Sequence, residues 1–171
     1  MAYITESRRD NGFFPNFSIA QNMAISRSLK DGGYKGAMGL FHEVDEQRTA
    51  EAQRELLALK CHSVNQNITE LSGGNQQKVL ISKWLCCRPE VIIFDEPTRG
   101  IDVGAKAEIY KVMRQLADDG KVILMVSSEL PEIITVCDRI AVFCEGRLTQ
   151  ILTNRDDMSE EEIMAWALPQ E

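Results

Sequence analysis

The sequence lacks the glycine-rich loop that many nucleotide-hydrolysing proteins use to hold phosphate. No G-x-x-x-x-G-K-[ST] pattern occurs among its 171 residues. It also lacks a signal peptide and any apolar run long enough to cross a lipid bilayer. Its five cysteines form no C-x-x-C pair, so we expect reduced thiols and no cysteine-based metal site. A membrane role would therefore have to come through a partner.

Positive charge is scarce as well. The chain has 19 Lys and Arg against 26 Asp and Glu, which gives a formal net charge of −7 at pH 7. A nucleic-acid surface needs clustered basic residues, and the pair Arg8 and Arg9 is too small to supply one. We therefore expect no nucleic-acid partner.

A short glycine motif is the first positive signal. Residues 71–77 read LSGGNQQ, and an apolar helical pattern follows them. Ser72 is a candidate N-cap, and Gly73 and Gly74 leave the helix end without side chains, so that its N–H groups can approach an anion. Taken alone, the motif also fits an ordinary capped helix after a glycine turn.

A second motif makes an anion-binding site the better interpretation. The apolar run 91–94 is typical of a strand inside a parallel sheet, and it ends directly in Asp95 and Glu96. Open α/β sheets bind ligands at the carboxyl ends of their strands. Asp95 can hold Mg²⁺ through a water molecule, and Glu96 can orient and deprotonate an attacking water. A solvated strand end is the plain alternative.

These residues resemble the nucleotide-binding domain of ATP-binding cassette transporters. Residues 71–75 resemble the signature motif, 91–96 the Walker B strand and 98–102 the D-loop, which contains Asp102. The similarity begins near Tyr3, covers almost the whole chain, and is strongest to the second cassette of the sugar-import branch. Subunits for ribose, galactose, arabinose, xylose and allose belong to that branch, and overall similarity favours allose, although the residues themselves do not decide the sugar.

The resemblance implies the fold and the partners. It predicts an incomplete P-loop NTPase (RecA-like) α/β core with a helical subdomain, whose Walker A strand and loop would precede residue 1. One partial domain is expected, with a Q-loop region at 1–22, a helical and signature subdomain at 23–88, and Walker B and the remaining α/β core at 89–171. The implied cofactors are ATP and Mg²⁺. The implied partners are the missing N-terminal cassette regions, a transmembrane sugar permease and, indirectly, a periplasmic sugar-binding protein.

The resemblance also assigns roles to residues. Ser72, Gly73, Gly74 and Asn75 would contact ATP held by the opposite cassette, Glu96 would be catalytic and Asp95 would bind Mg²⁺ through water. Two positions depart from the common pattern: Glu6 stands at the Q-loop position in place of Gln, and Ser128 at the switch position in place of His. Because a hydroxyl cannot act as an imidazole does, Ser128 puts hydrolysis at this half in doubt.

Periodicity predicts the remaining elements. A polar helix is expected at 45–60, with Leu56, Leu57 and Leu59 as its apolar contact. Ile109, Val112, Met113 and Leu116 recur at helical spacing, between a cap at Asp102 and a stop at Gly120. Further predictions are a second buried strand at 122–126, a short helix from Leu130-Pro131, a third strand at 140–143, a hairpin turn at Glu145-Gly146, and a capping box of Ser159 and Glu162.

Three classes of function remain open from the sequence. The first is an ATP-hydrolysing sugar-import subunit at the cytoplasmic face of a bacterial inner membrane, attached through its permease. The second is a non-transport cassette ATPase, against which the acidic balance argues. The third is an interaction domain without catalysis, for which the missing phosphate loop argues and against which the retained motifs argue.

Overall fold

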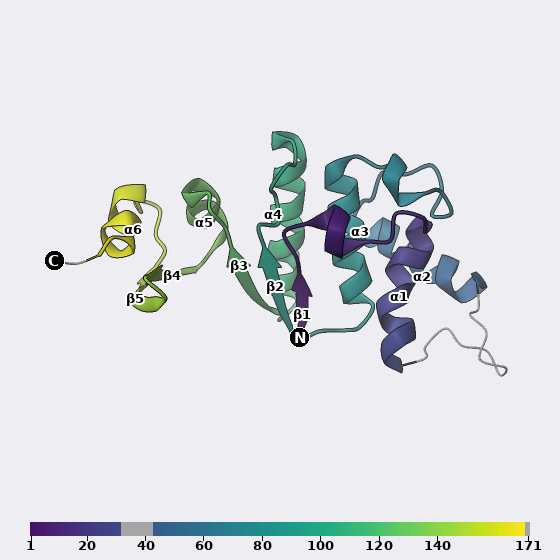
Figure 1. Ribbon diagram of the computed structural model, residues 1–171, viewed down its shortest axis with the longest axis horizontal. Coiled ribbons are helices and arrows are strands. Elements are labelled where there is room, and N and C mark those ends of the chain that lie inside the picture. The colour runs from purple at the N-terminus through teal and green to yellow at the C-terminus, as the bar shows by residue number, and fades with distance from the viewer. Residues whose placement is uncertain (32–42, 170–171) are drawn as a thin grey trace. The chain divides into compact units, whose positions relative to one another are not determined.

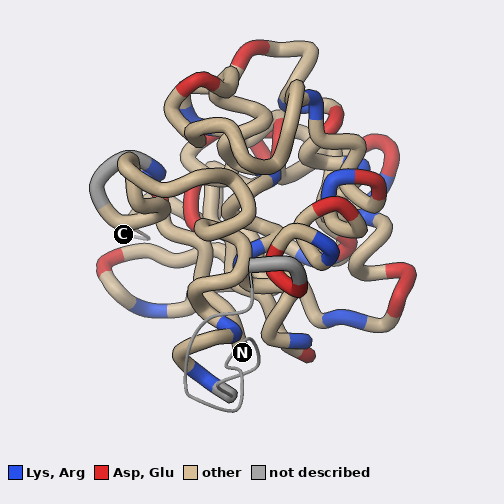
Figure 2. The backbone as a smooth tube through the Cα atoms, turned by 90° about the vertical axis from the view of Figure 1, so that its right-hand side faces the viewer, with Lys and Arg blue, Asp and Glu red and all other residues tan. Residues whose placement is uncertain are grey.

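A computed structural model describes residues 1–31 and 43–169. The chain forms two compact units, Met1–Val126 and Ser127–Glu171, and each is described here by itself. Within the described residues, no helix has the length and apolar character needed to cross a membrane. Lys and Arg are interspersed with Asp and Glu along the tube in Figure 2.

A parallel three-stranded sheet forms the centre of the first unit. Its strands are β1 (Ala2–Ile4), β2 (Val91–Asp95) and β3 (Val122–Val126), in the order β1-β2-β3. Figure 1 shows β1, at the N-terminus, beside β2, although about 90 residues separate them in the sequence. Ile92 and Phe94 of β2 are fully buried. All three strands are parallel, so their carboxyl ends lie at one edge, where β2 ends in Asp95.

Among the residues that the structure describes, four α-helices belong to the first unit. They are α1 (Ile19–Asp31), α2 (Glu43–Leu56), α3 (Gly73–Leu85) and α4 (Val103–Asp118). A π-helical turn, η1 (Arg8–Gly12), follows β1, and a 3-10 turn, η2 (Ile68–Glu70), precedes α3. Buried residues of α1 and α3, including Met23 and Leu80, share one apolar core with the segment before η2. The helices α1, α2 and α3 thus occupy most of the described part of the region that was expected to be helical.

The helix α4 follows its predicted pattern. It begins after Asp102, whose side chain accepts a hydrogen bond from the Ala105 N–H at 2.9 Å, and Gly120 adopts a left-handed φ of 84° beyond its end. Ile109, Met113 and Leu116 are buried. Val112, the fourth residue of the predicted face, is half-buried. The predicted cap and stop and the other three residues of the face are therefore confirmed.

The second unit contains a hairpin and two helices. They are α5 (Leu130–Val136), β4 (Arg139–Cys144), β5 (Arg147–Thr153) and α6 (Glu160–Ala167). Glu145 and Gly146 both have positive φ, of 49° and 76°, as a two-residue hairpin turn requires. The Ser159 hydroxyl accepts from the Glu162 N–H at 3.2 Å, but the Glu162 carboxylate pairs with Arg155, so only half of the expected capping box forms.

Two expectations about elements are wrong. The polar helix ends at Leu56, because Ala58 turns into the left-handed region with φ of 47°, and Leu56 is 62% exposed while Leu57 and Leu59 are buried. The strand at 122–126 is not buried, since Val122, Leu124 and Val126 are each more than half exposed. The predicted strand at 140–143 forms as β4, which pairs with β5 in a hairpin, and the third strand of the parallel sheet is β1, which was not predicted.

Candidate functional site

Two acids lie where β2 ends. Asp95 is the last residue of this central strand and Glu96 follows it, and both are half-buried. The Tyr3 hydroxyl, from the neighbouring strand β1, donates a hydrogen bond of 2.5 Å to Asp95 Oδ2. This bond and the negative charge of Asp95 raise the pKa of Tyr3, so the hydroxyl keeps its proton and remains a donor. One oxygen of the Asp95 carboxylate is thereby fixed in direction.

The backbone holds Glu96 in an unusual conformation. Its φ is 48°, in the left-handed region that residues with a Cβ rarely adopt. Its N–H donates to the Val126 carbonyl at 2.9 Å, and its carbonyl accepts from the Arg99 N–H at 3.2 Å. Such strain costs about 1–3 kcal/mol and is concentrated at functional sites. The two bonds anchor the turn that presents the Glu96 side chain beyond the strand.

The glycine motif opens the helix α3. Ser72 occupies the N-cap position with an extended backbone, but its side chain makes no cap bond to the helix, so the expected cap is wrong. The Ser72 hydroxyl instead accepts from Asn75 Nδ2 at 2.9 Å, and Asn75 Oδ1 accepts from the Lys60 N–H at 3.0 Å. The first N–H groups of a helix have no partner within it. The Ser72 side chain therefore leaves them available.

The starts of α3 and α4 lie against each other. A Cβ added to Gly74 would come 2.6 Å from the Ala105 Cβ, a distance that real structures do not tolerate. A Cβ on Gly73 would lie 3.5 Å from the Gly100 carbonyl oxygen. Close approach therefore requires glycine at position 74, whereas 3.5 Å at Gly73 is an ordinary contact. Gly73 and Gly74 thus lie beside Gly100, Ile101 and Ala105.

Two further positions were predicted, Glu6 and Ser128. Glu6, just after β1, is exposed and forms an ion pair with Arg99, three residues beyond Glu96. Ser128 belongs to the second unit, where it is exposed. The first unit therefore contains Glu6, Asp95 and Glu96, together with the start of α3 at residues 72–75 and the loop at residues 99–102. Ser128 belongs to the second unit.

Comparison with known families identifies this arrangement. Residues 1–99, more than half of the chain, match the ABC transporter family. The chain belongs to the ABC transporter family. Residues 71–75 and the strand end at Asp95 and Glu96 both lie within the matched range.

The similar proteins are sugar-import subunits, as expected. The D-allose import ATP-binding protein AlsA of Escherichia coli (strain K12) is 99% identical over all 171 residues, which make up 34% of that protein. The ribose import ATP-binding protein RbsA of a Bacillus cereus strain is 46% identical over 98% of this chain and 33% of its own length. The L-arabinose transport ATP-binding protein AraG of Geobacillus stearothermophilus is 47% identical over 96% and 31%. The chain thus spans about a third of the length of these curated relatives.

Solved structures support the fold. A dimeric ATP-binding cassette bound to ADP and phosphate, in a post-hydrolysis state, superposes with a TM-score of 0.70 at 22% sequence identity. The match covers 90% of this chain and 63% of that one. The expected partial P-loop NTPase fold, with its parallel sheet and helical subdomain, is confirmed.

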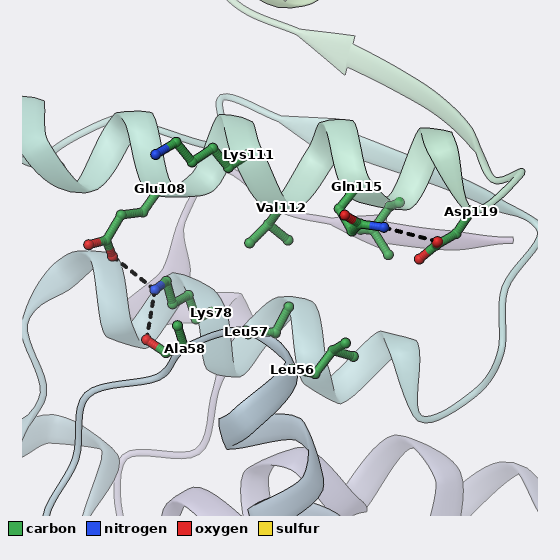
Figure 3. A pocket seen from close by; sticks show the side chains of 10 residues that line it. Leu56, Leu57, Ala58, Lys78, Glu108, Lys111, Val112, Gln115 and Asp119 are labelled. Atoms are coloured by element: carbon green, nitrogen blue, oxygen red, sulfur yellow. Dashed lines mark hydrogen bonds and ion pairs between the residues drawn. The ribbon is translucent and has the colours of Figure 1, made fainter.

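An ion pair joins the signature helix to α4 further along. Lys78 of α3 is almost fully buried, and its ammonium group donates to Glu108 at 2.9 Å and to the Ala58 carbonyl at 3.0 Å (Figure 3). Lys78 and Lys60 hold the pKa of Glu108 below its ordinary value. A mostly apolar groove of about 330 Å³ lies alongside, between α4 and the end of α2. Its lining contains neither Asp95 nor Glu96.

Sequence reasoning missed three side chains of the site. Tyr3 contacts Asp95, Arg99 pairs with Glu6, and Arg8 donates to the carbonyls of Gly73 and Gly100. Their partners lie 65 to 93 residues away in the chain, beyond the reach of any periodicity. The adjacent basic pair at Arg8 and Arg9 was a visible signal, but it pointed only to charge.

Proposed function

We propose that this chain supplies the signature motif, Walker B strand and D-loop of an ATP-hydrolysing subunit in a bacterial monosaccharide importer, with D-allose as the sugar. The observation that carries the proposal is the 99% identity, over the whole chain, to a D-allose import ATP-binding protein. The site geometry supports it, because Asp95 and Glu96 leave the carboxyl end of the central strand as ligand-binding α/β sheets require.

The Walker B acids have separate roles in this proposal. Among the described residues, no group of three or more His, Cys, Asp or Glu forms a metal-binding cluster. Mg²⁺ fits nevertheless, because it prefers oxygen ligands, keeps several waters and needs only one or two carboxylates. Asp95, held by Tyr3, would bind it through a water. When bound, Mg²⁺ neutralises phosphate charge.

Glu96 is the proposed general base. Its carboxylate would orient the attacking water and accept its proton. The strained backbone at φ 48° supports this role, because such conformations are held where a side chain must point in one direction. The neighbouring ion pair of Glu6 with Arg99 ties the Q-loop position to the same turn.

The signature helix would act on ATP held by an opposite cassette. Ser72, Gly73, Gly74 and Asn75 form the start of α3, where Ser72 is exposed and makes no cap bond to the first N–H groups of the helix. The positive end of the helix dipole stabilises the charge that grows on the phosphate oxygens. Asp102 would shape the D-loop by capping α4, and Ser128 would stand at the switch position.

The permease is the proposed membrane partner, and a periplasmic sugar-binding protein would act through it. Phe14, which is 47% exposed, and Phe17 stack with ring centroids 5.1 Å apart just beyond the Q-loop position. Exposed aromatic pairs support a protein interface. Phe13 is buried and belongs to the core. The subunit would sit at the cytoplasmic face of the inner membrane, attached through this permease.

A polypeptide of residues 1–171 alone is expected not to hydrolyse ATP. Its sequence contains no Walker A pattern, so neither a backbone cradle nor a Lys positions the β- and γ-phosphates near Glu96. Phosphate release by that polypeptide, abolished in Glu96→Gln, would contradict this expectation.

The decisive experiment uses the full-length Escherichia coli relative, assembled with its permease and binding protein in lipid vesicles. D-allose should stimulate ATP hydrolysis, D-ribose should do so less, and Ser72→Arg should remove the stimulation. An assembly that is stimulated by ribose but not by allose would refute the proposed sugar. An assembly whose ATP hydrolysis is indifferent to every sugar would refute the importer function.

A further inference from the structure

Arg8 donates hydrogen bonds to two segments of the site, the start of α3 at Gly73 and the loop before α4 at Gly100. Its Nη1 donates to the Gly73 carbonyl at 3.0 Å and its Nη2 to the Gly100 carbonyl at 3.3 Å. Gly73 is the first residue of the signature helix, and Gly100 lies in the D-loop. Arg8 itself starts η1, just past the Q-loop position. One guanidinium thus joins three motif segments.

The surroundings of Gly73 show how closely the guanidinium fits. A Cβ added to Gly73 would lie 3.2 Å from Arg8 Nη1 and 3.5 Å from Nη2. A Cβ on Gly100, whose φ is 67°, would lie 3.5 Å from Nη2. The guanidinium therefore packs directly over both glycines, and most closely over Gly73.

A second contact ties the same segment to the D-loop. Glu6, two residues before Arg8, pairs with Arg99, the residue before Gly100. The stretch from Glu6 to Arg8 therefore holds the turn after Glu96 by two side chains of opposite charge.

We propose that Arg8 is a positioning residue that sets the direction of the first N–H groups of the signature helix. The proposal rests on the function proposed above. The peptide group between Gly73 and Gly74 is planar and trans, so the Gly73 carbonyl and the Gly74 N–H point in opposite directions. Holding that carbonyl fixes the Gly74 N–H, which is one of the donors that the helix leaves unused.

Charge adds to this geometric effect. A hydrogen bond from a cation is stronger than one between neutral groups, and it polarises the peptide that accepts it. The Gly74 N–H thereby becomes a better donor to an anion. A forked guanidinium can bond two carbonyls at once, whereas the ammonium group of Lys is a single point charge. Arg8 is therefore not interchangeable with Lys.

The test measures kcat and KM for ATP in the full-length Escherichia coli relative, assembled with its permease, with each variant fully folded at the assay temperature. Arg8→Met keeps the apolar stem and removes both donors. It should lower kcat about 10- to 100-fold, because small misplacements of a catalytic group cost this much. KM should change less than kcat, and Arg8→Lys should fall between Arg8→Met and the wild type.

Arg54 provides a matched control. It is also half-buried in the first unit, and its Nη2 donates to the Cys61 carbonyl at 2.9 Å, away from the motifs. Arg54→Met should leave kcat per folded molecule within about twofold of the wild type, since its guanidinium bonds Glu51 and the Cys61 carbonyl rather than Gly73 and Gly100.

Each outcome decides one question. An Arg8→Met variant with wild-type kcat would overturn the positioning role, and an Arg8→Lys variant with wild-type kcat would overturn the need for a fork. If Arg54→Met lowered kcat as much as Arg8→Met, the effect would be structural and the inference wrong. A wild-type assembly without ATP hydrolysis would instead refute the proposed function.

Discussion

The helices α3 and α4 begin side by side, but their N-termini are capped in different ways. At α4, the Asp102 carboxylate accepts the Ala105 N–H and closes the helix end from within. At α3, the Ser72 hydroxyl bonds the Asn75 side chain and leaves the helix uncapped by its own N-cap residue. The N-cap side chain of α4 therefore satisfies one of its first N–H groups, whereas the N-cap side chain of α3 leaves the first N–H groups of that helix available to a ligand.

The difference does not come from serine as such. In the second unit Ser159 caps α6 in the ordinary way, with its hydroxyl accepting from the Glu162 N–H. What sets Ser72 apart is the amide of Asn75, which is anchored by the Lys60 N–H and turns its Nδ2 toward the hydroxyl. When another side chain bonds the N-cap hydroxyl, that hydroxyl does not bond the first N–H groups of the helix. Those N–H groups then stay available, as anion binding at a helix N-terminus requires.

The largest expected effect comes from blocking the open end. Ser72→Arg should lower sugar-stimulated ATP hydrolysis of the full-length relative by at least about 100-fold, because the side chain prevents phosphate from approaching the helix N–H groups. Asn65→Arg, at an exposed position of the same unit, should leave the rate unchanged. Equal rates for the two variants would mean that the open end does not meet the nucleotide.

The contact between the two helix starts should be nearly as sensitive. Gly74→Ala is expected to lower the free energy of unfolding by about 1–3 kcal/mol, because its Cβ would overlap that of Ala105. Urea unfolding should show a smaller loss in an Ala105→Gly background, where the overlap is gone. If the losses are the same in both backgrounds, the helices do not touch at this point.

The capping difference predicts a smaller effect on stability. Asp102→Ala should cost about 1 kcal/mol, the usual loss for an N-cap that bonds its helix. Ser72→Ala should change the free energy of unfolding by less than half of that, because no cap bond exists to lose. Similar urea midpoints for the two variants would show that Ser72 caps α3 in solution.

The smallest effect concerns pH and the pair of Lys78 with Glu108, further along the same two helices. The pKa of Glu108 is held below its ordinary value of 4.5. Its ionised form therefore stabilises the folded state above about pH 4.5, and this contribution is lost as pH falls through the lowered pKa. Because Glu108 is partly exposed, the effect should be modest.

Thermal unfolding at several pH values tests this coupling. Glu108→Gln should be less stable than the wild type at pH 7, where Lys78 loses its charged partner. The difference should shrink as the wild-type carboxylate is protonated in acid. A difference that stays constant down to acid pH would mean that the charge of Glu108 does not matter.

Local patterns in the sequence predicted α4 well. Its cap, buried face and glycine stop all depend on residues within one helix length, so periodicity and capping rules suffice. The strand β1 was missed, because three residues with an exposed Tyr3 between two buried neighbours give too short a pattern. The exposure of β3 was missed because an apolar run shows only that a strand can be buried. It does not show whether another part of the chain covers that strand.

The motifs predicted the acids and the helix start of the candidate site, but not the contacts that hold them. The cap at Ser72 failed because rules for N-caps do not consider a competing side chain at Asn75. The bonds of Tyr3 and Arg8 join segments that only the sheet and the helix packing bring together. Long-range hydrogen bonds of this kind need the tertiary fold to be known.

The left-handed backbone of Glu96 has a consequence for protein engineering. Ala58, Arg88 and Glu145 also have positive φ, and glycine at any of these positions would relieve about 1 kcal/mol of backbone strain. Glycine at Glu96 would bring the same relief and remove the proposed base. A selection for thermal stability alone would accept all four substitutions. At Glu96 it would therefore gain stability and lose ATP hydrolysis.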